Sequence, residues 1–167
     1  PELLEVVGRA FENLGPPLPL DLLLADNSEA HMRVGAEHPT AGSAPCQVEA
    51  PWQCIALRRG RTSHFPDGHA LDACPRMGKT TCGALCVPVT FMGKTLGVVH
   101  AELQPGQHVE TQQIERLETL AAATGARMSA IRSFRQVQLQ ATTDPLTGLL
   151  NRRSREEEVR SLVQRAQ

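Results

Sequence analysis

Cysteine and histidine are the residues of this sequence with the most distinctive chemistry. The chain contains the five cysteines Cys46, Cys54, Cys74, Cys82 and Cys86. His64 lies within this stretch and His100 shortly after it. Thiolate and imidazole groups bind zinc and iron, and thiols can also pair or be oxidised. We therefore begin with metal, redox and small-ligand sites.

Cys54, His64 and Cys74 form a candidate metal set, with nine residues between each pair of neighbours. This spacing is not that of a compact zinc-binding motif. The alternative is that Cys54 is a small core residue and Cys74 a thiol in a loop, because buried cysteine commonly serves only in packing. Both interpretations stay open at this point.

A redox role would require thiols with a lowered pKa, and positive charge nearby would lower it. Four arginines lie close in sequence to Cys54 and Cys74: Arg58, Arg59, Arg61 and Arg76. The odd number of cysteines and the lack of an export signal predict a reducing cytoplasm, with thiols that are free or bound to a ligand. In that compartment, a free cysteine often has no special role.

His100 belongs to the second strand of a predicted β-hairpin. Residues 82–92 and 95–103 are strand-like and flank Gly93-Lys94, which we read as a two-residue type II′ turn. Counting from this turn pairs Val87 with His100 and places Cys86 opposite Ala101 on the other face. His100 is then on an apolar face. Three roles stay open for it there: a haem ligand, a pH-sensitive group, or a core residue whose polar atoms have hydrogen-bond partners.

Helices and strands alternate along the rest of the chain. The pattern predicts a helix over residues 2–14, a strand over 18–25 with a hairpin partner over 29–35, a loop over 36–50 and a short helix over 52–59. This mixture predicts an α+β fold.

A long helix is predicted from residue 111 to about residue 141. Its apolar residues follow 3-4 spacing through Leu117, Ala121, Thr124, Met128 and Ile131. Such a narrow stripe is typical of a seam between two paired helices, so we expect a homodimer. The alternative is that the stripe, above all its first half, packs on its own domain.

Composition and charge exclude several partner classes. Hydrophobic residues make up 41% of the chain and aromatic residues only 3%. Residues 1–110 carry a net charge of −4 and residues 111–167 a net charge of +3, so no strongly basic face is expected. We therefore expect no nucleic-acid partner, and the lack of a long apolar run predicts no membrane partner.

The segment Asp144-Pro-Leu-Thr-Gly-Leu-Leu-Asn-Arg-Arg153 resembles the motif that opens GGDEF domains, the diguanylate cyclases that make cyclic di-GMP from GTP. The chain lacks adjacent glycines, so it lacks the signature loop, and Mg²⁺ and GTP would bind only beyond Gln167. The resemblance therefore implies an inactive fragment of a cyclase. It also implies coupling rather than catalytic roles for Asp144, Leu146, Thr147, Gly148, Leu149 and Asn151.

The preceding part is similar to GAF domains, which are sensory modules. The resemblance is carried by Trp52-Gln-Cys-Ile-Ala-Leu-Arg-Arg-Gly60, Cys86-Val-Pro-Val89 and Gly93-Lys-Thr-Leu-Gly-Val-Val-His-Ala-Glu102. It implies an antiparallel sheet of about six strands, a common sheet size, with helices on one face. A small-ligand pocket would lie on the other face, below a roof formed by residues 36–81.

These features predict three parts: a GAF sensor domain over residues 1–110, a signalling helix over 111–141, and the start of a GGDEF domain over 142–167 with a short isolated helix. The expected function is the sensory region of a diguanylate cyclase. Its ligand, a small molecule or a metal ion, would contact Cys54, His64, Cys74, Cys86 and His100. Two alternatives are a ligand-free dimerisation and spacer module and a GAF-fold methionine sulfoxide reductase.

Overall fold

A computed structural model of the chain describes residues 2–13, 18–38, 46–78 and 80–142, together with positions 147, 149, 151, 155, 156, 160, 164 and 165. Two compact units are present, Pro1–Arg127 and Met128–Gln167. The first unit contains the sheet and takes in the first half of the long helix. No helix among the described residues is long and apolar enough to cross a membrane.

The first unit is built on an antiparallel sheet, which confirms the α+β prediction. In the described part of the chain it has five strands, in the order β2-β1-β5-β4-β3. The strands are β1 Leu20–Ala25, β2 Met32–His38, β3 Ser63–Phe65, β4 Gly83–Phe91 and β5 Lys94–Leu103. The two longest strands, β4 and β5, pair with each other near the middle of the sheet.

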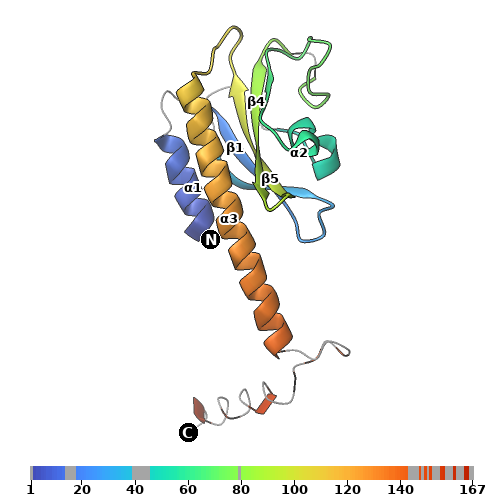
Figure 1. Cartoon of the computed structure of the whole chain (residues 1–167), viewed down its shortest axis with the longest axis vertical. Helices are drawn as coiled ribbons and strands as arrows, with labels where there is room; N and C mark the ends of the chain where they lie inside the picture. The colour runs from blue at the N-terminus through green and yellow to red at the C-terminus, as the bar shows by residue number, and fades with distance from the viewer. Residues whose placement is uncertain are drawn as a thin grey trace. The chain divides into compact units, whose positions relative to one another are not determined.

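Helices and loops cover both faces of this sheet (Figure 1). The helical elements are α1 Glu2–Glu12, the 3-10 helix η1 Pro51–Gln53, α2 Ile55–Arg59 and α3 Thr111–Thr142. Figure 1 shows α1 and the start of α3 on one face and α2 with its neighbouring loops on the other. Side chains alternate along β5 and therefore contribute to the packing on both faces of the sheet. Val99 and Ala101 face one way, and Val98 and His100 face the other.

The hairpin forms, but its turn lies one residue earlier than predicted. Strand β4 ends at Phe91, and Met92 and Gly93 occupy the turn with φ values of 48° and 77°. Positive φ at both positions is the type I′ geometry, whereas we had predicted a type II′ turn with Gly93 first. An irregularity between Val89 and Thr90 then shifts the register further along.

This shift changes the face on which His100 lies. Cys86 pairs directly with His100, and Val87 pairs with Val99. The prediction that Cys86 opposes Ala101 and that His100 shares a face with Val87 was therefore wrong. A one-residue change in pairing reverses the face of every side chain beyond it. His100 and Cys86 are neighbours on the same face of the sheet.

The first half of α3 packs against its own sheet. Leu117, Ala121 and Thr124 are almost fully buried. At Gly125 the helix backbone lies so close to the Thr90 carbonyl group of β4 that an added Cβ would clash with it. For these three residues the predicted dimer seam was wrong, because their side chains are already covered.

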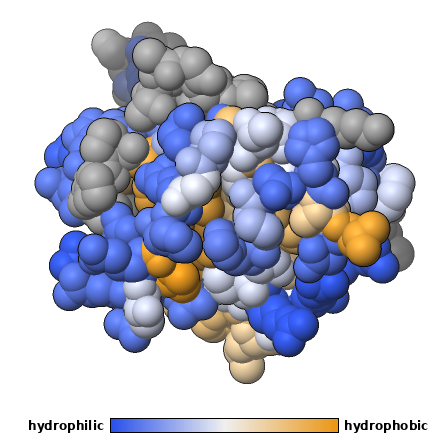
Figure 2. Space-filling view, turned by 90° about the horizontal axis from the view of Figure 1, so that it is seen from above, coloured by the Kyte–Doolittle hydropathy of each residue, from blue (hydrophilic) through white to orange (hydrophobic). Residues whose placement is uncertain are grey.

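The second half of α3 begins the second unit. Ile131 is 38% exposed and Phe134 65% exposed, while Met128 is partly buried. Pairing of two chains through this half stays a prediction. On the rest of the described surface, the large exposed apolar residues are spread over different elements, for example Val6 on α1 and Val34 on β2. Figure 2 shows a mainly hydrophilic surface with hydrophobic areas that are small and separate.

Part of the predicted coupling motif lies outside the described residues, namely Asp144, Leu146 and Gly148. Among the described positions, the Asn151 amide donates a hydrogen bond to the Thr142 carbonyl oxygen at 2.9 Å. The Leu149 amide donates a long one to the Thr147 hydroxyl oxygen at 3.5 Å. Most of the predicted short last helix also falls outside the described residues.

Candidate functional site

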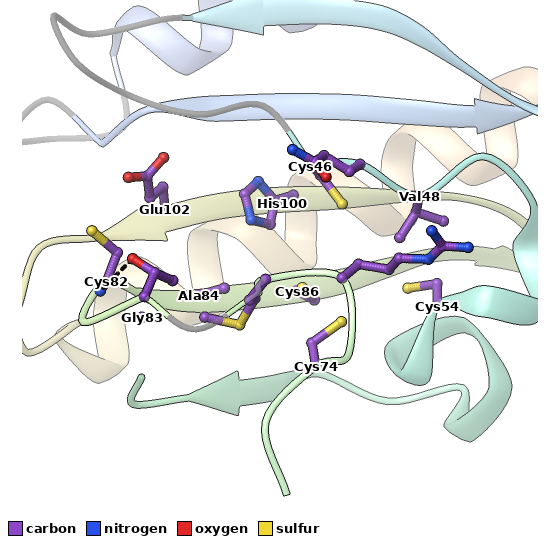
Figure 3. Close-up of a pocket in the computed structure, with 14 residues that line it drawn as sticks. Cys46, Val48, Cys54, Cys74, Cys82, Gly83, Ala84, Cys86, His100 and Glu102 are labelled. Atoms are coloured by element: carbon purple, nitrogen blue, oxygen red, sulfur yellow. Dashed lines mark hydrogen bonds between the residues drawn. The ribbon is translucent and has the colours of Figure 1, made fainter. Parts of the chain in front are cut away.

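A cavity of about 130 Å³ lies on the face of the sheet opposite α1 and α3. All five cysteines of the chain line it, although they come from different segments. Its lining is mainly apolar, and its polar members besides the thiols are Gln47, Arg76, Thr80, His100 and Glu102. Figure 3 shows these side chains around the cavity. The most distinctive chemistry of the sequence is thus gathered at one place.

Strands β4 and β5 form the floor of the cavity. Cys86 pairs with His100, and Ala84 pairs with Glu102 two residues further along. Directly paired residues of an antiparallel sheet point to the same face, with their Cβ atoms about 4.5–5.5 Å apart. The register therefore places a thiol, an imidazole and a carboxylate in neighbouring positions. Cys86 and His100 are buried, at 5% and 7% exposure.

Asp21 joins the floor of the cavity to its roof. Its Oδ2 lies 3.3 Å from Nδ1 of His100 on the neighbouring strand. The same oxygen accepts a hydrogen bond from the backbone N–H of Cys46 at 3.2 Å. Because Nδ1 of His100 faces Asp21, the carboxylate fixes the orientation of the imidazole ring. It also anchors the roof segment to the sheet.

The roof is formed by three segments. The first runs through Cys46 and Val48, and the second starts α2 at Cys54. The third is the turn at Cys74, whose carbonyl oxygen accepts a hydrogen bond from the Met77 amide at 3.0 Å. Val48, Cys54 and Cys74 belong to one hydrophobic cluster with Cys86 and other core residues. Packing within this cluster holds the three segments over the sheet.

Burial holds three of the cavity thiols, those of Cys46, Cys54 and Cys86, in their protonated form. Burial raises the pKa of Cys46 from 9.0 to about 11 and raises the pKa of Cys86 well above 9.0. The pKa of Cys54 is raised as well, because burial outweighs its hydrogen bonds from the Leu57 and Ala56 backbone. Desolvation disfavours the charged thiolate. The hypothesis that arginines lower the pKa of Cys54 was therefore wrong.

The predicted metal set is not brought together. His64 lies in β3, where its neighbours Ser63 and Phe65 are buried and His64 itself is exposed. Cys54 and Cys74 are both buried, at 3% and 8% exposure. Alternation along the strand turns His64 away from them. Within the described residues there is no group of three or more His, Cys, Asp or Glu side chains that could hold a metal ion.

Four of the five predicted ligand residues line the cavity: Cys54, Cys74, Cys86 and His100. His64 does not. Sequence reasoning missed Asp21, although an acid within the apolar strand Leu20–Ala25 is a signal that a buried partner exists. It also missed Glu102, which lies two residues beyond His100 on the same face once the register is corrected.

This architecture recurs in solved structures. The GAF domain of a phosphoenolpyruvate-protein phosphotransferase from Coxiella burnetii superposes with a TM-score of 0.63 at 16% identity, over 80% of this chain and 86% of that chain. A GAF domain/HD domain protein from Geobacter sulfurreducens gives 0.64 at 15% identity, over 78% and 92%. The chain has the GAF fold.

Another structural match is the free methionine-R-sulfoxide reductase of Neisseria meningitidis, solved in complex with its substrate. Its TM-score is 0.58 at 16% identity, over 78% of this chain and 80% of that chain. No protein-family model matches the sequence, and no curated protein matches it. At these identities the comparisons establish the fold, while function has to be argued from the cavity.

Proposed function

We propose that this GAF domain is the sensory region of a diguanylate cyclase, and that it binds a small ligand in the cysteine-lined cavity. The observation that carries the proposal is the position of the cavity. Its floor is formed by β4 and β5, and α3 packs against the opposite face of the same sheet. The segment 144–153, which resembles the opening of a GGDEF domain, follows α3 directly.

Strand β4 provides a short physical route from ligand to helix. Cys86 lines the cavity, and four residues later the Thr90 carbonyl group lies against Gly125 of α3. The Thr62 hydroxyl, just before β3, also donates a hydrogen bond to a carboxylate oxygen of Glu118 on α3. A ligand that favours one position of β4 would therefore favour one position of the helix. Its differential affinity for the two states limits the shift.

The cavity also restricts the kind of ligand. An apolar cavity of about 150 Å³ holds a benzene molecule, so about 130 Å³ accommodates a molecule of similar size. Thiols and aliphatic groups line most of it, and His100, Glu102 and Arg76 supply polar contacts. A small, largely apolar molecule with one polar group fits this lining. The low aromatic content offers a purine little stacking surface.

The proposal is tested in the longer protein that continues into a cyclase domain. Insertion of seven residues after Arg132 preserves the heptad phase of α3, whereas insertion of three or four residues changes it. We expect regulated cyclic di-GMP synthesis to survive the seven-residue insertion and to be lost in the other two. Equal activity and equal regulation in all three proteins would contradict coupling through the helix.

The ligand step is tested by filling the cavity. Ala84 is buried on its floor, so Ala84→Met extends a side chain into the space that a ligand would occupy. We expect the original protein to respond to cell extract, and we expect the Ala84→Met variant to fold and to make cyclic di-GMP at one fixed rate without that response. A full response would contradict a ligand in this cavity and would favour the spacer alternative.

A second candidate activity is reduction of free methionine sulfoxide. The cysteine lining favours it, and reductases from Neisseria meningitidis and Thermoplasma acidophilum share the GAF fold. The raised pKa of Cys54 and Cys86 opposes it, because the thiolate is the nucleophile in thiol chemistry. Incubation with free methionine sulfoxide and a dithiol reductant, followed by detection of methionine, separates the two candidates.

A further inference from the structure

Cys54 and Cys74 are two buried thiols in the roof of the cavity, whereas the third buried thiol, Cys86, lies on its floor. Cys54 directly precedes α2, and Cys74 lies in the turn after β3. They are 3% and 8% exposed and belong to the same hydrophobic cluster. Cys74 is the one other thiol that contributes to the raised pKa of Cys54, after burial as the main cause, so the two side chains lie close together. Figure 3 shows both sulfur atoms pointing into the same part of the cavity.

We propose that Cys54 and Cys74 form a dithiol site for a compound of trivalent arsenic, with the cavity holding its small organic group. The inference deepens the proposed function, since it rests on the cavity being a ligand site and names the chemical class of the ligand. The cavity volume of about 130 Å³ is close to the size that holds one benzene ring. An aryl-arsenic group therefore matches both the thiol pair and the space beside it.

The reaction balances without an oxidant or a reductant. An organoarsenic dihydroxide, which is the hydrated form of an arsenic oxide, exchanges its two As–O bonds for two As–S bonds. The two thiol protons leave with the two hydroxide groups as two molecules of water, and arsenic stays trivalent. The product carries no charge. This matters in a roof where burial disfavours the thiolate of Cys54, because neither sulfur is left as a buried anion.

Neutrality also separates this ligand from metal cations. A monovalent soft cation held by two thiolates leaves one net negative charge in an apolar cluster, which is costly. A divalent cation in a closed site needs further ligands, and the described residues offer no group of three or more suitable side chains. A trivalent arsenic centre with one organic substituent needs only the two sulfur atoms. The two-thiol site therefore fits a trivalent arsenic compound better than it fits a monovalent or a divalent metal cation.

The test uses the reduced 167-residue protein and phenylarsine oxide as the probe. At one equivalent, we expect one phenylarsenic adduct per chain by intact mass spectrometry, with two of the five thiols protected from a thiol reagent. Digestion should yield the peptides of Cys54 and Cys74 joined through arsenic. A small dithiol added in excess should release the adduct, whereas a monothiol should not.

Matched variants locate the site. Because the second thiol binds intramolecularly, loss of either one should weaken the affinity for phenylarsine oxide by about 100-fold or more. We expect this for Cys54→Ser and for Cys74→Ser. Cys82→Ser is the control, since Cys82 is partly exposed at the edge of the cavity and should retain the affinity. Thermal unfolding of each variant shows that it is folded.

Three results would overturn the inference: full affinity in both single variants, an adduct that bridges another pair of cysteines, or reaction at single thiols only. The peptide map gives this answer in the original protein even where a variant fails to fold. Failure of this inference is distinguished from failure of the proposed sensory function, because the latter is judged by cyclase regulation in the insertion series. Failure of arsenical binding with intact helix-dependent regulation would remove only the ligand assignment.

Discussion

Two glycines in helices allow the contact between α3 and the sheet to be measured. Gly125 lies in α3, and a Cβ added there would lie closer than 3.0 Å to the Thr90 carbonyl oxygen and 3.1 Å from its carbon. Gly8 lies in α1, and a Cβ there would meet nothing within 4 Å. The same substitution should therefore have opposite effects at the two sites.

The expected magnitudes follow from two opposing contributions. Alanine in place of glycine in a helix gains about 1 kcal/mol from helix propensity. At Gly8 this gain stands alone, so Gly8→Ala should raise the free energy of unfolding by about 1 kcal/mol. At Gly125 the clash is with backbone that cannot rotate away, and overpacking costs about 1–3 kcal/mol. Gly125→Ala should therefore lower the free energy of unfolding by about 1 kcal/mol net.

Urea denaturation followed by circular dichroism measures both changes in the free energy of unfolding. In a thermal scan of a chain of this size, each change should move the melting temperature by about 3 °C. The m-value should stay unchanged, so that the midpoint alone reports stability. A Gly125→Ala variant as stable as Gly8→Ala would refute the close packing of α3 against β4. It would also remove the physical basis for transmission through Thr90.

Three further predictions concern the site and the exposed half of α3. Asp21→Ala removes the acceptor of the Cys46 amide and the partner of His100, so it should lower the free energy of unfolding by about 2 kcal/mol. It should also speed hydrogen exchange at the Cys46 amide, and unchanged exchange there would contradict the anchoring role of Asp21. Because burial raises the pKa of Cys46 from 9.0 to about 11, its protonated thiol stabilises the fold below pH 9, and this contribution is lost as the pH rises to 11. Urea midpoints measured over this pH range should therefore fall less for Cys46→Ala than for the original protein. Equal losses in the two proteins would contradict this role of Cys46. Phe134 is 65% exposed, and Ile131 is exposed beside it. If two chains pair through the second half of α3, Phe134→Asp should convert the dimer into a monomer in sedimentation experiments. A dimer that is unaffected by this substitution would place the contact elsewhere.

Local pattern predicted the elements more reliably than their register. The apolar run after Pro16-Pro17 predicted β1, and the 3-4 spacing from residue 111 predicted α3 almost to its last residue. The β4–β5 turn was displaced by one residue, because glycine suits either central position of a primed turn and the choice between them depends on the strands. The register irregularity between Val89 and Thr90 then decided which face His100 occupies, and no pattern in the sequence predicted it.

The candidate site was predicted in part for a similar reason. Cysteine is rare and commonly buried, so its residue type alone pointed to Cys54, Cys74 and Cys86. The metal set failed at His64, whose direction depends on the alternation of a three-residue strand that the sequence hardly marks. Asp21 acts through partners 25 and 79 residues away in sequence, and contacts of that range are set by strand order.

The central claim is that the cavity binds a small molecule. Native mass spectrometry of the gently purified chain, compared with its denatured mass, tests this most directly. The account predicts an additional small-molecule mass on the folded chain that is absent after denaturation and absent from Ala84→Met. Bare chains, both as purified and after incubation with cell extract, would contradict the claim and would favour the spacer alternative.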